Sequence, residues 1–204
     1  MTIGQWFARV TATTVVRSPR LWRLFKGTLV RNFDRLAPEW NTTHVSADRL
    51  TTISAVFDAI DHAPRTVLDV GTGSGAVARL AASRWPDAVV NGVDASSGMI
   101  AEARRLAESD REVYEVADAS ALPFSDAAFE LVAQNNMIPF FDELARVTAP
   151  GGQVAVAFSR GASTPIWVPL ERIRRELAAR NFSHFADFSI GLGRGLLARK
   201  GDRS

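Results

Sequence analysis

The 204-residue sequence predicts an α/β fold, a mostly parallel sheet with helices on both faces. Two observations lead to this prediction. From residue 65 onward, short runs of branched apolar residues alternate with helical patterns, as in units whose parallel strands are joined through helices. Residues 67–75, VLDVGTGSG, also indicate a buried strand that ends in a glycine turn and opens a helix. Since ligands of such sheets bind beyond the carboxyl ends of the strands, this turn is the first candidate site.

Residues 1–62 are predicted to form a helical arm. Ile3, Trp6, Phe7 and Val10 follow helical spacing, and Ser18-Pro19 interrupts it. An apolar face then runs over residues 21–36, and Pro38 is expected to end that second helix. A third helix is expected over residues 47–60. We divide the chain into this arm, expected to cap the substrate, and a ligand-binding domain over residues 63–204.

The alternation within the second region places its elements. Strands are expected at 66–70, 88–94, 112–117, 129–134, 153–158, 182–190 and 195–199, and helices at about 76–84, 101–108, 143–147 and 169–180. Residues 149–152, Ala-Pro-Gly-Gly, are expected to form a sharp turn before the fifth strand.

Composition excludes several classes of site. The absence of cysteine removes disulfides, thiolate metal sites and cysteine nucleophiles, and three widely separated histidines argue against a metal centre. No apolar run reaches membrane-spanning length, and Arg9 interrupts the apolar start of the chain, which is unlike a signal peptide. We therefore expect a cytoplasmic protein.

Charge is unevenly distributed. Residues 1–33 carry six basic residues and no acid, whereas the remainder carries 18 basic and 22 acidic residues. Aromatic residues lie beside these arginines, a pattern that resembles an interfacial helix and suggests peripheral contact with an anionic membrane. A cap helix or a homodimer contact is the alternative. The preference for arginine over lysine extends over the whole chain and indicates a bias of composition. The number of arginines is therefore no sign of recognition, and we expect no nucleic-acid partner.

Acidic residues follow the next two predicted strands and complete a nucleotide-type site. Asp94 lies 19 residues after Gly75, where its carboxylate can accept both hydroxyls of a ribose. Asp118 follows the third strand, where it can accept from the exocyclic amine of adenine while the Ala119 N–H donates to a ring nitrogen. Met99 can pack its thioether on the adenine face, with a core-filling role as the alternative.

Four segments in this order resemble class I S-adenosylmethionine-dependent methyltransferases, in particular the small-molecule "type 11" group. They are VLDVGTGSG (67–75), GVDASSGMIAEAR (92–104), VADASALPFSDAAFELV (116–132) and ELARVTAPGG (143–152). The resemblance implies a Rossmann-like, seven-stranded sheet whose last strand is antiparallel. It also implies S-adenosylmethionine as cofactor and methyl transfer to a small-molecule or lipid-like acceptor. The expected cofactor-binding residues are Asp69, Gly71, Thr72, Gly73, Gly75, Asp94, Ala95, Met99, Asp118, Ala119 and Gln134.

A nicotinamide-dependent oxidoreductase is the main alternative, because residues 71–76 also satisfy the dinucleotide fingerprint. Asp69 argues against it, since a carboxylate there would lie close to a pyrophosphate but suits the cationic amino group of S-adenosylmethionine. A homologue that binds the cofactor without catalysis is a further alternative.

Methyl transfer to a bound acceptor needs alignment, and a base only where the acceptor must lose a proton. His44 in the arm is the candidate base, and a surface histidine between helices is the alternative, which the sequence favours. The candidate substrate-binding residues are Phe33, Trp40, Asn135, Phe140, Trp167 and Arg194, with Phe141 as a further pocket wall. Packing in the core is the alternative for the aromatic residues, and solvation for Arg194. Together they favour an apolar or aromatic acceptor.

Overall fold

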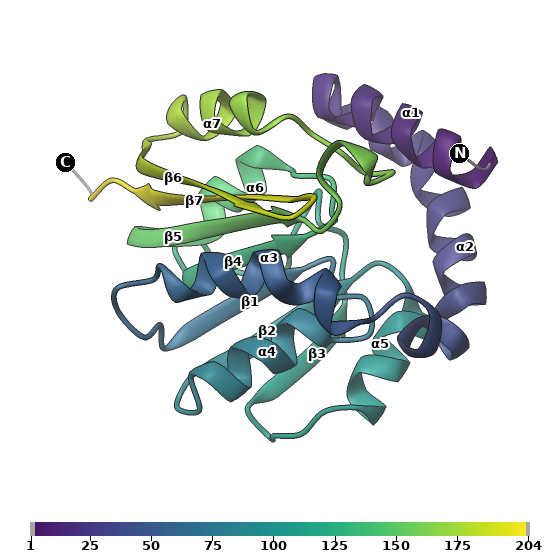
Figure 1. Cartoon of the computed structure of the whole chain (residues 1–204), viewed down its shortest axis with the longest axis horizontal. Helices are drawn as coiled ribbons and strands as arrows, with labels where there is room; N and C mark the ends of the chain where they lie inside the picture. The colour runs from purple at the N-terminus through teal and green to yellow at the C-terminus, as the bar shows by residue number, and fades with distance from the viewer. Residues whose placement is uncertain (1–2, 203–204) are drawn as a thin grey trace.

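The computed structural model describes residues 3–202, with side chains from residue 6, and contains one seven-stranded sheet (Figure 1). The strand order is β3-β2-β1-β4-β5-β7-β6, and β7 runs antiparallel to both of its neighbours. The strands are β1 (Thr66–Val70), β2 (Val89–Asp94), β3 (Glu112–Val116), β4 (Phe129–Asn135), β5 (Thr148–Phe158), β6 (Phe182–Ile190) and β7 (Gly193–Lys200). The predicted Rossmann-like fold is confirmed.

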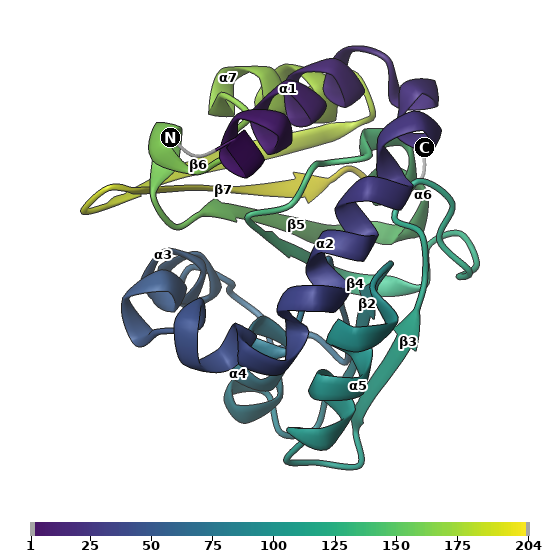
Figure 2. The same ribbon diagram turned by 90° about the vertical axis from the view of Figure 1, so that its right-hand side faces the viewer.

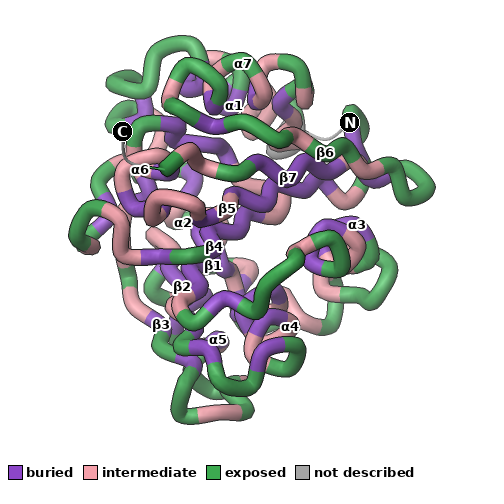
Figure 3. The backbone as a smooth tube through the Cα atoms, turned by 90° about the vertical axis from the view of Figure 1, so that its left-hand side faces the viewer, coloured by how far each residue is buried: buried purple, intermediate pink, exposed green. Residues whose placement is uncertain are grey.

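Alternating side chains of the central strands build two separate cores. Leu68 and Val132 face one core, and their neighbours Val67 and Leu131 face the other. This alternation explains the unbroken apolar runs of the sequence, because a strand covered on both faces needs apolar side chains at every position. Figure 3 shows the buried backbone concentrated in these central strands.

Helices cover both faces of the sheet. One core includes residues from α3 (Ala47–Asp58), α4 (Ala76–Arg84) and α5 (Ser97–Arg105). The other includes residues from α1 (Ile3–Arg17), α6 (Phe141–Val147) and α7 (Leu170–Ala178). Ile53 and Phe57 of α3 are fully buried, so this part of the predicted arm is a layer of the fold. Two short 3₁₀ helices, η1 (Pro19–Leu21) and η2 (Gly161–Ser163), lie in connections.

Helix α2 (Trp22–Thr43) runs past the ends of the parallel strands, on the right of Figure 1 and toward the viewer in Figure 2. The expectation that Pro38 ends this helix is wrong, because α2 continues through Pro38. A proline in a helix leaves the carbonyl four residues earlier without its N–H partner. That carbonyl belongs to Asp34 and faces Gly98 of α5, where a Cβ atom would lie 3.2 Å from the Asp34 oxygen. Close packing against α5 therefore accompanies the continuation of α2.

The turn expected at residues 149–152 lies inside β5. Thr148 pairs with Phe129 and Gln153 pairs with Leu131, so the intervening residues form a bulge. Gly151 adopts a left-handed conformation with φ of 72° at this bulge. No helix in the described part of the chain is long and apolar enough to cross a bilayer.

Candidate cofactor-binding site

The glycine turn joins β1 to α4 at the carboxyl edge of the sheet. Gly71, Gly73 and Gly75 have φ angles of 76°, 55° and 85°, a region that residues with a Cβ atom rarely occupy. The N–H groups of Gly71 and Thr72 both donate to the Val93 carbonyl of β2, at 2.8 and 2.9 Å. These bonds hold the turn against the neighbouring strand and place it beside the end of β2.

Asp69 is a buried carboxylate immediately before this turn. Its side chain is 1% exposed and accepts a 2.6 Å hydrogen bond from the Thr72 hydroxyl. Burial raises the pKa of Asp69 to about 7, and the nearby Asp94 charge adds to this effect, while the Thr72 hydroxyl opposes it. A cationic group bound here would be strongly favoured, because it would let this carboxyl ionise.

Asp94 ends β2 and ties two loops together. One carboxylate oxygen accepts from the Gly73 N–H at 3.0 Å, and the other accepts from the Ser96 N–H at 2.9 Å. Burial raises the pKa of Asp94, and these backbone hydrogen bonds oppose the rise. Each carboxylate oxygen has a further lone pair, so Asp94 can still accept hydroxyl donors from a ligand. Ala95 follows it in this loop, and Met99 of α5 is fully buried.

Asp118, after β3, already has partners from α2. Trp22 Nε1 donates to Asp118 Oδ1 at 2.9 Å, and Lys26 Nζ donates to Oδ2 at 2.8 Å. Partial burial raises the pKa of Asp118, but Lys26 and the Ser120 backbone outweigh it, so the pKa is lowered. The carboxylate predicted to face adenine is thus ion-paired within the protein, and Ala119 beside it is buried.

Helix α2 also contacts the first two loops of the site. Asp34 Oδ1 accepts from Ser96 Oγ at 2.6 Å and from the Gly98 N–H at 3.0 Å. Asn41 Oδ1 accepts from Ser74 Oγ at 2.7 Å. Together with Lys26, these side chains place α2 along all three loops that carry the predicted cofactor residues. Sequence reasoning missed Trp22, Lys26, Asp34 and Asn41 in this role, because their partners lie far away in the chain.

Gln134, near the end of β4, has unused hydrogen-bonding capacity. It is 0% exposed, and neither Oε1 nor Nε2 has a hydrogen-bond partner among the residues that the structure describes. An unpaired buried amide costs roughly 1–3 kcal/mol for each group, so a native protein is expected to use it. Gln134 lies on the strand beside β1, at the edge where the glycine turn begins.

Met137 lies over the first glycine of the turn. A Cβ atom on Gly71 would come within 2.7 Å of Met137 Sδ, so only glycine permits this contact. Methionine is flexible and adapts to the shape of its neighbours. The loop after β4 therefore supplies an adjustable side chain at this position, which the sequence reading had not assigned.

Aromatic side chains on α2 form a wall next to the turn. The rings of Trp40 and His44 are stacked, with centroids 4.2 Å apart and planes 4° from parallel, and Phe33 meets Trp40 edge-on at 5.6 Å. Trp40 Nε1 lies 3.7 Å from the Cβ position of Gly73, which brings the wall to the site. Burial, with a smaller contribution from Arg49, lowers the pKa of His44. His44 Nδ1 lies 2.6 Å from Thr43 Oγ1.

The other predicted substrate residues lie elsewhere or have other partners. Phe140 packs edge-on against Trp22 in the core, and Trp167 packs against the buried ring of Phe158. The Arg194 guanidinium donates to two carbonyls of its own hairpin. Asn135 faces α3, where its Nδ2 lies 3.5 Å from the Arg49 carbonyl and its Oδ1 has no partner. Phe141 is buried in α6.

A glycine turn with carboxylates near the ends of β1, β2 and β3 defines a nucleotide-type cofactor site on a Rossmann-like sheet.

Residues 67–152 match the methyltransferase domain family. The chain is 38% identical over 137 residues to demethylmenaquinone methyltransferase of Thermus thermophilus, which covers 61% of this chain and 62% of the relative. It is 32% identical over 120 residues to trans-aconitate 2-methyltransferase of Methylobacterium nodulans, covering 56% and 46%. The chain thus spans less than two thirds of each relative.

The fold also matches phosphoethanolamine N-methyltransferase 2 of Haemonchus contortus, solved with S-adenosylmethionine. The TM-score is 0.65 at 20% identity, over 81% of this chain and 56% of that one. Over the region that carries the predicted cofactor residues, the chain is similar to S-adenosylmethionine-dependent methyltransferases. The residues fit that cofactor: a buried carboxylate suits its amino group, the glycine turn admits close approach, and Gln134 has free amide groups.

Proposed function

We propose that this protein transfers a methyl group from S-adenosylmethionine to a small organic acceptor. The observation that carries the proposal is the fully buried, unpartnered amide of Gln134 at the carboxyl edge of β4. A side chain that has lost water and found no protein partner is expected to meet a ligand. Its position beside the glycine turn supports a ligand at the point where we expect the cofactor and the acceptor to meet.

When bound, S-adenosylmethionine supplies a methyl carbon on a positively charged sulfur. The protein's contribution is alignment, which can lower a barrier by up to roughly 7–11 kcal/mol in favourable cases. Asp69 would pair with the amino group, Asp94 would accept the ribose hydroxyls, and Asp118 would accept from adenine. Gln134 would orient the reacting ends, because its amide offers both a donor and an acceptor.

His44 is our candidate for a base where the acceptor must lose a proton. Its lowered pKa keeps the imidazole neutral near pH 7. Thr43 Oγ1 is close to Nδ1, which leaves Nε2 to face a ligand. The stacked ring of Trp40 fixes the orientation of the imidazole. The base would therefore be held in one orientation on the inner side of α2.

The aromatic wall of α2 favours a planar, apolar acceptor. Phe33, Trp40 and His44 present ring faces and edges rather than charged groups. The relatives act on different acceptors, a demethylmenaquinone in one case and trans-aconitate in the other, so the wall is the feature that favours the apolar class. A cytoplasmic location is part of this proposal.

Two measurements test the function. Calorimetry should show binding of S-adenosylmethionine and no binding of NADH; the reverse result would support the oxidoreductase alternative. Incubation of the protein with cofactor labelled in the methyl group and a cell extract should give a labelled product, identified by mass spectrometry. Binding without any labelled product would point instead to a homologue that holds the cofactor without catalysis.

A further inference from the structure

The outer faces of α1 and α2 combine exposed apolar side chains with arginines. Trp6 is 55% exposed and Leu24 is 75% exposed, and Val10 and Leu21 are partly exposed nearby. Figure 2 shows the two helices along one side of the molecule. We call this region the arm surface; it consists of Trp6, Val10, Arg17, Arg20, Leu21, Arg23, Leu24, Arg31 and Arg35.

Packing between the two helices makes the arm surface continuous. The rings of Phe7 in α1 and Phe25 in α2 meet edge-on, with centroids 5.9 Å apart. This contact joins α1 to α2 next to Trp6 and Leu24 in the sequence. The short helix η1 forms the elbow between α1 and α2 and carries Arg20 and Leu21.

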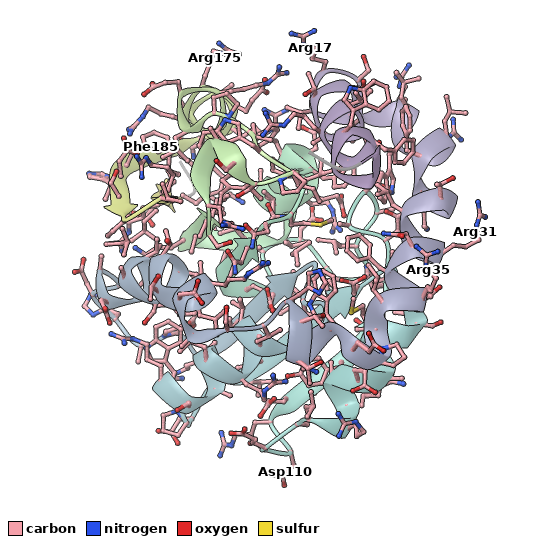
Figure 4. All side chains as sticks on the ribbon, turned by 45° about the vertical axis from the view of Figure 1, so that its right-hand side comes forward. Arg17, Arg31, Arg35, Asp110, Arg175 and Phe185 are labelled. Atoms are coloured by element: carbon pink, nitrogen blue, oxygen red, sulfur yellow. The ribbon has the colours of Figure 1, made fainter. Side chains whose placement is uncertain are left out.

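The arginines of the arm surface are unneutralised. Within the described part of the chain, Arg17, Arg20 and Arg23 form no ion pair or side-chain hydrogen bond. Arg31 and Arg35 contact only a threonine and an asparagine of their own helix. Figure 4 shows Arg17, Arg31 and Arg35 extending away from the body of the protein.

The two acids of the neighbouring helix α6 do not cancel this charge. A pocket of about 250 Å³ places Asp142 and Glu143 near Arg20 and Arg23. Asp142 pairs with Arg180, and Glu143 pairs with Arg146. Two other basic residues of the arm face inward instead: Arg9 donates to the carbonyls of Ala162 and Thr164, and Lys26 pairs with Asp118.

We propose that the arm surface binds the anionic face of a lipid membrane. Tryptophan and leucine among arginines suit the boundary between headgroups and acyl chains, where apolar side chains insert and guanidinium groups meet lipid phosphates. A second copy of the chain would bring two unneutralised surfaces of the same sign together. A nucleic acid would meet the arginines but would leave Leu24 without an apolar partner.

Co-sedimentation with vesicles tests the proposal on the full chain. We expect binding to phosphatidylcholine vesicles that contain phosphatidylglycerol at low salt, loss of that binding at high salt, and little binding to phosphatidylcholine alone. The Arg17→Gln/Arg23→Gln variant should bind roughly 25-fold more weakly, since each charge contributes about fivefold. Leu24→Gln should also weaken binding without any change of charge.

A matched variant removes the same charge elsewhere. Arg65 and Arg175 are exposed and have no ion-pair partner in the described residues, so Arg65→Gln/Arg175→Gln should bind vesicles like the unchanged protein. An equal loss in this control would overturn the proposal, because it would show a response to net charge alone. So would the absence of binding to anionic vesicles at low salt. Equally tight binding to a DNA duplex, insensitive to Leu24→Gln, would favour a nucleic acid instead.

Discussion

Lys26 Nζ of helix α2 lies 2.8 Å from Oδ2 of Asp118, the carboxylate that we predict to accept from adenine. Trp22 Nε1 donates to the other oxygen of the same carboxylate. Helix α2 of the protein therefore satisfies part of the predicted cofactor site. Lys26 already neutralises the charge of this carboxylate, so it competes with any ligand that takes Asp118 as a charged acceptor.

Removal of the lysine should ease this competition. The ion pair is partly exposed, and exposed pairs contribute about 0.2–1 kcal/mol, so Lys26→Met should tighten S-adenosylmethionine binding by about 1.4- to fivefold. Calorimetry measures the change. Arg31→Met removes the same charge from the outer side of α2 and should leave the affinity unchanged. Weaker binding by Lys26→Met would show that the lysine assists the cofactor.

Asp94→Ala should weaken S-adenosylmethionine binding by more than roughly tenfold, because charge-assisted hydrogen bonds contribute about 1.5–3 kcal/mol. The substitution also removes the acceptor of the Gly73 and Ser96 N–H groups, so thermal unfolding must be measured beside the titration. Asp110→Ala, at an exposed position shown in Figure 4, is the matched control. Unchanged affinity in a folded Asp94→Ala protein would remove the ribose assignment.

Cofactor binding should depend on pH through Asp69. The pKa of this buried carboxyl is about 7 in the free protein, so the carboxyl is increasingly neutral at lower pH. A cationic amino group binds the ionised form, and the affinity should therefore fall as the pH drops, by up to about tenfold for each pH unit below 7. Titrations between about pH 6 and pH 8 check this. Asp69→Asn should bind weakly with this dependence removed; an identical profile in the variant would contradict the assignment.

Gln134→Leu should stabilise the fold and abolish methyl transfer. Leucine replaces a buried amide that has no partner, which is expected to raise the free energy of unfolding by about 1–3 kcal/mol. Thr11→Val is the control, because the Thr11 hydroxyl is also buried without a partner but lies in α1. Denaturant unfolding should show a gain in both variants, whereas the transfer assay should distinguish them. A loss of stability in Gln134→Leu would indicate that the amide has a structural role.

The sequence predicts the sheet and the acidic residues of the site because both depend on local patterns. The strand, the glycine turn and the start of α4 at Ala76 follow from neighbouring residues, and Asp94 and Asp118 follow from their strands. The path of α2 through Pro38 could not be predicted, because it depends on packing against Gly98, which lies far away in the chain. The lack of a hydrogen-bond partner for Gln134 likewise depends on the packed structure, so the neighbouring residues in the sequence do not predict it.

Two faces of helix α2 have different surroundings. Lys26, Asp34 and Asn41 join one side to the cofactor loops, while Leu24 and Arg31 on the other side face outward. Both sets of side chains belong to one helix, so any movement of α2 that separates Lys26 from Asp118 would also shift the outward side chains. If the outer side is attached to lipid, thermodynamic linkage is reciprocal: whatever factor the lipid applies to cofactor affinity, the cofactor applies to lipid affinity. Helix α2 would then couple the arrival of the protein at a bilayer to its affinity for the methyl donor.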